Sequence, residues 1–216
     1  DLSSTTTNRT LTLAGTGNLV VDGVIGNGAS TASNLTLSGT GTVTLNGANT
    51  YAGTTRINSG TLVIAAESAL GANPATFAAT RLTLNGGTLR TTATMTIDDA
   101  NRGVTVLAPG GTLAAEGGTT LTIANAIAGA GQLTAAGPGT VTLGGTTANT
   151  FTGGLAVADG TVNLGKTAGI NAVGGGAVVV GDGVGAAQSA SLVLQASNQL
   201  PDATAVEQPS VGGQQP

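Results

Sequence analysis

Cysteine and histidine are both absent from this chain of 216 residues, and charged residues make up only 7% of it. Without cysteine the chain has no disulfide framework, no thiolate nucleophile and no cysteine-ligated metal centre. Without histidine it lacks the commonest general base and metal ligand, which excludes a Ser-His-Asp triad and histidine zinc sites. We therefore expect no enzyme activity, no catalytic residue, no cofactor and no bound metal.

Aromatic residues are nearly absent as well, since Tyr51, Phe77 and Phe151 are the only three. A globular core of this size normally buries several large rings, because each removes a large apolar area from water. Gly, Thr and Ala instead fill 110 of the 216 positions. This composition favours a core made of thin layers of Leu, Val, Ile and Ala.

Charge and hydropathy exclude two further classes of partner. The net charge is −4 and the six cations are scattered, whereas nucleic-acid binding needs clustered Lys and Arg. No stretch approaches the roughly 18 apolar residues of a transmembrane helix. The first ten residues, DLSSTTTNRT, do not resemble a signal peptide. We expect a mature region or an excised piece of a longer protein, with no nucleic-acid partner and no transmembrane segment.

Apolar residues alternate with Thr, Ser or Asn in short runs along almost the whole chain. Such alternation predicts half-buried strands, and Gly, Asn or Asp at the ends of most runs predicts tight corners. Helical periodicity is limited to two Ala-rich stretches, 65–79 and 124–130, so the chain is predicted to be all-β. The clearest predicted strands are 10–13, 18–21, 34–37, 42–45, 61–64, 81–84, 94–97, 104–107, 120–123, 140–143, 161–164, 177–180 and 191–194.

An internal repeat decides between the all-β architectures. The sequence GTVTLNGANTYAGTTRINSGTLVI at 41–64 returns at 139–164 as GTVTLGGTTANTFTGGLAVADGTVNL. A repeat that keeps apolar positions and corner glycines is typical of a solenoid, whose coils bury their faces on one another. Asn-Gly pairs such as Asn46-Gly47 and Asn85-Gly86 would suit the hairpins of a sandwich, which is the alternative. The solenoid predicts inward columns of Leu45, Ile57, Leu62, Ile64, Leu143, Val157, Val162 and Leu164.

The repeated sequence at 41–64 and its second copy at 139–164 resemble the autotransporter-associated β-strand repeat, also called the passenger-associated transport repeat. One copy covers about 35–64 and a second covers about 133–164, where Phe replaces Tyr and two extra residues lengthen one corner. The resemblance covers roughly 9–206 and implies a right-handed parallel β-helix, and we expect 1–206 to form a single solenoid. Residues 207–216 are rich in Pro, Gly and Gln and are expected to be a flexible tail or linker. The motif residues, assigned a structural role, are Asn49, Tyr51, Gly53, Gly60, Asn149, Phe151, Gly153 and Gly160.

Two functional interpretations of single residues compete with this structural one. Asp98 and Asp99 are the only neighbouring acids, and adjacent strand residues point to opposite faces, which disfavours a paired-carboxylate glycosidase. Carboxylates on different coils can still meet in space. Tyr51 and Phe151 form either an exposed pair that stacks a ligand or two wedges that fill coil corners, and we favour the wedges.

The resemblance implies a non-catalytic stem or passenger segment of a secreted or surface protein, extracellular or on the outer surface of a Gram-negative bacterium. Its role would be spacer or scaffold, with adhesion to a host or cell-surface glycan or protein. The expected partners are neighbouring coils of the same or a longer chain. A self-assembling extracellular fibre, joined end to end as a homo-oligomer or filament, is the first alternative. A polysaccharide-acting β-helix enzyme is the second.

Overall fold

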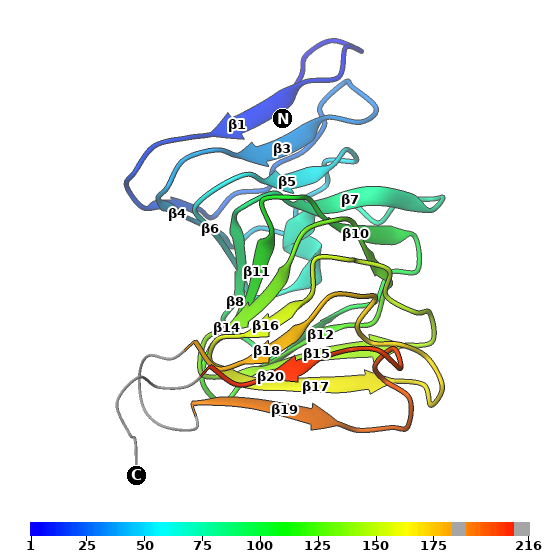
Figure 1. The fold of residues 1–216 in the computed structure, drawn as a ribbon. Coiled ribbons are helices and arrows are strands. Elements are labelled where there is room, and N and C mark those ends of the chain that lie inside the picture. Colours follow the sequence, from blue (N-terminus) through cyan, green and yellow to red (C-terminus); the bar gives the residue numbers. More distant parts are fainter. Residues whose placement is uncertain (183–188, 210–216) are drawn as a thin grey trace.

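The computed structural model describes residues 1–182 and 189–209, and there the chain winds into a parallel β-solenoid (Figure 1). Within these residues the strands stack in three sheets. The six-stranded sheet contains β1 (Thr10–Leu13), β3 (Asn34–Leu37), β5 (Thr55–Ile57), β7 (Ala78–Leu84), β10 (Arg102–Val106) and β13 (Ile127–Ala128). The nine-stranded sheet contains β2 (Leu19–Val21), β4 (Thr42–Leu45), β6 (Thr61–Ile64), β8 (Thr88–Thr91), β11 (Gly111–Ala115), β14 (Leu133–Ala136), β16 (Leu155–Val157), β18 (Val178–Val180) and β20 (Val206–Glu207). The five-stranded sheet contains β9 (Met95–Ile97), β12 (Thr120–Ile123), β15 (Thr140–Gly145), β17 (Gly160–Lys166) and β19 (Ala190–Leu194).

Every strand pair in the described part of the chain is parallel and joins one coil to the next. For example, β4 pairs with β6 through Thr42 and Thr61, and β17 pairs with β19 through Val162 and Leu192. Parallel pairing requires a crossover between neighbouring strands, and here each crossover is the rest of a coil. The solenoid prediction is therefore confirmed, and the sandwich of hairpins is wrong.

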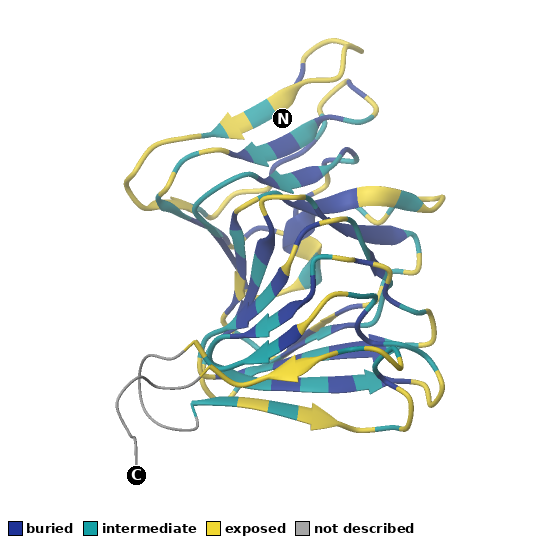
Figure 2. Cartoon of the chain, in the orientation of Figure 1, coloured by how far each residue is buried: buried dark blue, intermediate teal, exposed yellow. Residues whose placement is uncertain are grey.

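The core consists of aliphatic columns that run along the axis between the sheets (Figure 2). All eight side chains predicted to point inward are at most 1% exposed. In the nine-stranded sheet, for instance, Leu62 of β6 stacks between Val43 of β4 and Leu89 of β8. A coil leaves room for one layer of such side chains, which accounts for the scarcity of aromatic rings.

All thirteen predicted strands are present, with small shifts at their ends. The strands that the alternation missed are short or made of small residues, such as β5, β13 and β16. Of the two Ala-rich stretches, 65–79 contains one 3-10 turn, η1 (Glu67–Leu70), and 124–130 contains β13. In 124–130 the pairing of β13 with β10 thus overrides the high helix propensity of alanine.

The cross-section changes along the axis, because within the described residues only the nine-stranded sheet runs from the first coils to the last. The six-stranded sheet belongs to the N-terminal and middle coils, and the five-stranded sheet to the middle and C-terminal coils (Figure 1). No helix in the described ranges is both long enough and apolar enough to cross a membrane. Of the predicted tail, Glu207 closes strand β20, while 210–216 lie outside the described residues.

Candidate functional site

The repeated motif is the site where sequence and structure agree most closely, and its centre is a buried asparagine. Asn49 is 4% exposed and lies in the corner between β4 and β5. Its side-chain Oδ1 accepts a hydrogen bond from Ile25 N of the preceding coil at 2.7 Å, and its Nδ2 donates to Ala69 O of the following coil at 2.7 Å. One side chain therefore joins three successive coils.

Asn149 makes the same pair of contacts in the second copy. Its Oδ1 accepts from Ile127 N at 2.8 Å, and its Nδ2 donates to Ala172 O at 2.6 Å. Asn149 is 3% exposed, so both bonds are shielded from water. A buried backbone group without a partner is costly. Asparagine suits this position because its short side chain carries one acceptor and one donor.

Two motif glycines lie where a coil passes close to the coil before it. A Cβ at Gly53 would collide with the backbone oxygens of Ser33 and Ala32. A Cβ at Gly153 would collide with the backbone of Gly131 and Gln132. Any larger residue at either position would push the two coils apart.

The other two motif glycines need both space and an unusual backbone. Gly60 has a φ of 67° and Gly160 a φ of 68°, in the left-handed region that favours glycine. Each also lies against the carbonyl oxygens of two glycines in the preceding coil, Gly39 and Gly41 in the first copy. The four glycines and two asparagines form a common backbone frame of the two copies.

Both aromatic motif residues are buried in the core. Tyr51 and Phe151 are both 0% exposed, so neither can stack on a ligand at the surface. Their backbone N–H groups make equivalent bonds, from Tyr51 to Ile25 O and from Phe151 to Ile127 O, both at 3.2 Å. The Tyr51 hydroxyl bonds Thr55 Oγ1 at 2.6 Å, and burial raises the pKa of Tyr51 to about 12.

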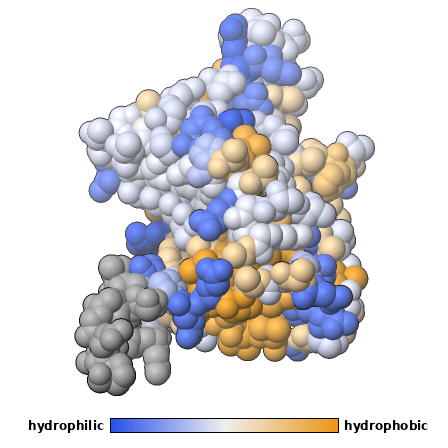
Figure 3. All heavy atoms as spheres, viewed as in Figure 1, coloured by the Kyte–Doolittle hydropathy of each residue, from blue (hydrophilic) through white to orange (hydrophobic). Residues whose placement is uncertain are grey.

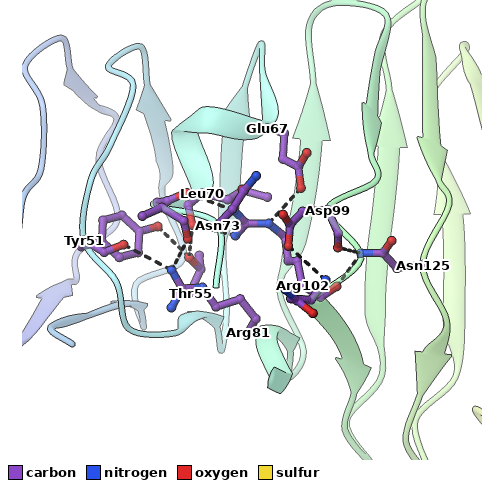
Figure 4. Close-up of polar contacts among 12 residues, drawn as sticks. Tyr51, Thr55, Glu67, Leu70, Asn73, Arg81, Asp99, Arg102 and Asn125 are labelled. Atoms are coloured by element: carbon purple, nitrogen blue, oxygen red, sulfur yellow. Dashed lines mark hydrogen bonds and ion pairs between the residues drawn. The ribbon is translucent and has the colours of Figure 1, made fainter. Parts of the chain in front are cut away.

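Two buried arginines surround the first copy, and neither was identified from the sequence (Figure 4). Arg102 is 0% exposed and bonds Glu67 Oε1 at 2.9 Å and Leu70 O at 3.0 Å. Arg81 is 3% exposed, and its guanidinium donates to the carbonyl oxygens of Ala52 and Ala72. Burial, with the nearby charge of Arg102, lowers the pKa of Arg81. The two guanidinium groups thus bond backbone carbonyl groups of segments that lie outside the β-strands, namely those of Ala52, Leu70, Gly71 and Ala72.

Two carboxylates from different coils, Glu67 and Asp98, do lie close together, but Glu67 is held in an ion pair with Arg102. Burial raises the pKa of Glu67, and the bond from Arg102 lowers it by less. Asp98, from the coil that follows, acts in both directions, because a hydrogen bond from its backbone lowers the pKa of Glu67 and its carboxylate charge raises that pKa by less. Asp99 caps a turn by accepting from Asn101 N at 3.1 Å. In the described part of the chain, no three His, Cys, Asp or Glu side chains are grouped so that they could hold a metal ion.

A buried cation of a different kind lies just after the second copy, at the end of β17. Lys166 is 1% exposed, and its Nζ donates to Gly144 O at 2.5 Å and Asn125 O at 3.4 Å. Burial lowers the pKa of Lys166 to about 8. The backbone N–H of Lys166 donates to the side chain of Gln199, which is 0% exposed, at 2.8 Å. Two backbone carbonyl groups and the side-chain amide oxygen of Gln199 thus accept the hydrogen bonds that Lys166 donates.

The asparagine contacts show that each repeat extends one coil beyond the matched motif. Ala69-Leu70-Gly71 follows the first copy, and Ala172-Val173-Gly174 follows the second. In both, the alanine carbonyl accepts from the motif asparagine, and a Cβ on the glycine would meet the carbonyl oxygen of the motif aromatic residue. A comparison of the two copies carried further downstream would have found this Ala-x-Gly pattern.

Comparisons with known proteins agree with this geometry. The family model of the passenger-associated transport repeat matches residues 35–64 and 133–164. Over 114 residues the chain is 45% identical to a Brucella suis protein described as the adhesin BmaC autotransporter. The match covers 53% of this chain and only 3% of that much longer protein. No solved structure matches the chain. Residues 35–64 and 133–164 thus match the passenger-associated transport repeat, and in each match one asparagine bonds the coils on either side.

Proposed function

We propose that this chain is a non-catalytic stem segment of an autotransporter passenger, secreted or exposed on the surface of a Gram-negative bacterium, and that it serves as a spacer with adhesive contacts. The observation that carries the proposal is the asparagine of each repeat, which ties three coils together through buried hydrogen bonds. Such bonds favour one coil register over others and so favour a straight, stiff segment. The relative's description as an adhesin supports the adhesive part.

The surroundings of the titratable groups support a structural role rather than catalysis. General acid–base catalysis places a group with a tuned pKa within reach of a substrate. The four groups with shifted pKa values in the described residues are engaged with the protein itself: Glu67 with Arg102, Tyr51 with Thr55, and Arg81 and Lys166 with backbone carbonyls. Burial accounts for their shifts, and none needs a catalytic explanation.

A second candidate is end-to-end assembly into a fibre. The first coil exposes Leu19 by 42% and Val20 by 57%, and the last described strands expose Leu194 by 51% and Val206 by 53%. An open hollow of about 690 Å³ lies between β18, β19 and β20 and is lined partly by Leu192 and Leu194. Figure 3 shows hydrophobic residues gathered at this end of the molecule. Unpaired strand edges next to apolar side chains favour pairing with another chain.

Electron microscopy and sedimentation of the purified chain separate these two candidates. Discrete short rods that sediment as monomers at micromolar concentration are expected of a spacer. Long filaments, with monomers recovered by Leu194→Asp, would establish the fibre instead. Turnover on a panel of neutral and acidic glycans that is lost in Asp98→Asn would contradict both and point to an enzyme.

Adhesion is tested by displaying the chain on the surface of a non-adherent bacterial strain. Displaying cells are expected to bind cultured epithelial monolayers more than cells that display an unrelated solenoid of similar length. Equal binding by the two sets of displaying cells would overturn the adhesive part of the proposal. The spacer role would then be tested by the electron microscopy alone.

A further inference from the structure

One loop projects from the side of the solenoid and carries the third aromatic ring. This projecting loop, residues 71–80, connects η1 to strand β7 and includes the first residues of that strand (Figure 1). It contains no charged residue. Phe77 is 64% exposed, whereas Tyr51 and Phe151 are fully buried. Ala75, Thr76, Ala79 and Thr80 beside it are also exposed, and the projecting end is coloured towards hydrophobic in Figure 3.

The base of the projecting loop is fixed by side chains from the neighbouring coil. Arg102 Nη2 donates to Gly71 O at 3.0 Å and to Asn73 Oδ1 at 2.9 Å. Asn101 Nδ2 donates to Pro74 O at 2.9 Å. Backbone bonds secure the two ends, from Ala72 N to Tyr51 O at 3.0 Å and from Ala78 N to Asn101 O at 2.9 Å. A loop held in this way loses little conformational freedom when its tip is bound.

We propose that Phe77 is the anchor by which this segment docks into an apolar pocket on a partner protein; the proposal rests on the adhesive function proposed above. Single exposed hydrophobic residues are ordinary on protein surfaces. Phe77 differs because its loop is uncharged and is held by a fully buried arginine. A buried ring contributes a large apolar area, and aromatic residues are enriched in the cores of protein interfaces.

The shape and charge of the loop favour a protein over a glycan. A convex tip with a single ring fits a concave apolar pocket, whereas a sugar chain needs a platform of several rings. The charged groups around the base of the loop are engaged there or below it: Glu67 pairs with Arg102, Arg81 bonds backbone carbonyls, and Asp99 of the neighbouring coil accepts from Asn101 N. Binding through the tip should therefore depend little on salt, since salt screens charges and leaves apolar burial intact.

The test compares Phe77→Ser with Val20→Ser, whose side chain is similarly exposed (57%) but lies on the first coil. The purified chain is titrated on cultured epithelial monolayers, in low salt and in about 0.5 M salt, before and after the cells are treated with protease or with glycosidases. We expect Phe77→Ser to bind at least tenfold more weakly, with an unchanged melting temperature. Wild-type chain and Val20→Ser should bind alike, with little effect of salt, and should lose binding after protease treatment.

Several outcomes would overturn the proposal. Undiminished binding by Phe77→Ser would show that the tip is not the anchor, while the adhesive function would stand. Binding that survives protease but is lost after glycosidase would assign the contact to a glycan. Failure of the wild-type chain to bind, in solution and when displayed on bacteria, would remove the adhesive function and this inference together.

Discussion

The two repeats share a backbone frame but differ in the chemistry of the corner that the frame encloses. In the first copy a tyrosine bonds Thr55, and Arg81 and Arg102 lie close by. In the second copy Phe151 and Leu155 occupy the equivalent positions, and both are 0% exposed. The hydroxyl of the ring and the hydroxyl of its partner are thus present together or absent together. The asparagine and the glycines define the repeat, while the corner tolerates either a polar or an apolar pair.

If the frame is the common element, removing either asparagine should have the same large effect. Asn49→Leu leaves Ile25 N and Ala69 O without their partners, and Asn149→Leu does the same to Ile127 N and Ala172 O. Each unpartnered buried group costs about 1–3 kcal/mol, so each variant should lower the free energy of unfolding by about 4 kcal/mol in urea titrations.

Asn46→Ala is the matched control, because the side chain of Asn46 makes one exposed hydrogen bond, to Asp22. It should change the unfolding free energy by less than about 0.5 kcal/mol. A difference of more than about 2 kcal/mol between Asn49→Leu and Asn149→Leu would show that the two frames are not equivalent.

The frame and the core columns were largely predictable, because their signals are local. Alternation predicted the inward side chains, and the repeat predicted the motif residues. The bridging role of Asn49 was not predictable, since its partners Ile25 and Ala69 are backbone groups that any residue could supply. Arg102 was missed for a related reason. A single arginine at the start of a strand has no local sign of burial, and its partners lie in the coil before it.

The buried cations of the two regions differ in their partners, and the pH dependence of the unfolding free energy tests this difference. Arg102 has a carboxylate partner, whereas the ammonium group of Lys166 bonds only carbonyl groups and has a pKa lowered to about 8. From pH 8 to pH 10 the unfolded chain, whose lysine has an ordinary pKa near 10.4, binds more protons at this site than the folded chain. The stability of the folded state should therefore rise with pH across this window, by about 2 kcal/mol from Lys166.

Lys166→Met provides the reference for that measurement. The difference in unfolding free energy between wild type and variant, followed by urea titration at several pH values, should shift in favour of wild type by about 2 kcal/mol from pH 8 to pH 10. The window ends there because Tyr51, with its pKa raised to about 12, destabilises the folded state above pH 10. A constant difference would mean that Lys166 keeps an ordinary pKa in the folded protein.

The smallest effect concerns the corner pair itself and asks whether the two chemistries can be exchanged. Tyr51→Phe removes one partner of the Thr55 hydroxyl, which still donates to Leu70 O at 3.3 Å, so we expect a loss of about 1 kcal/mol. Thr55→Val leaves the buried Tyr51 hydroxyl without its partner and should cost at least as much. The double variant should cost less than the sum of the two by about 1 kcal/mol, because the hydroxyls depend on each other. The reverse exchange in the second copy sharpens the comparison: Phe151→Tyr should destabilise, and adding Leu155→Thr should recover part of that loss. Strict additivity in both copies, measured by urea unfolding, would show that the Tyr51–Thr55 bond contributes nothing and that the joint change of ring and partner is incidental.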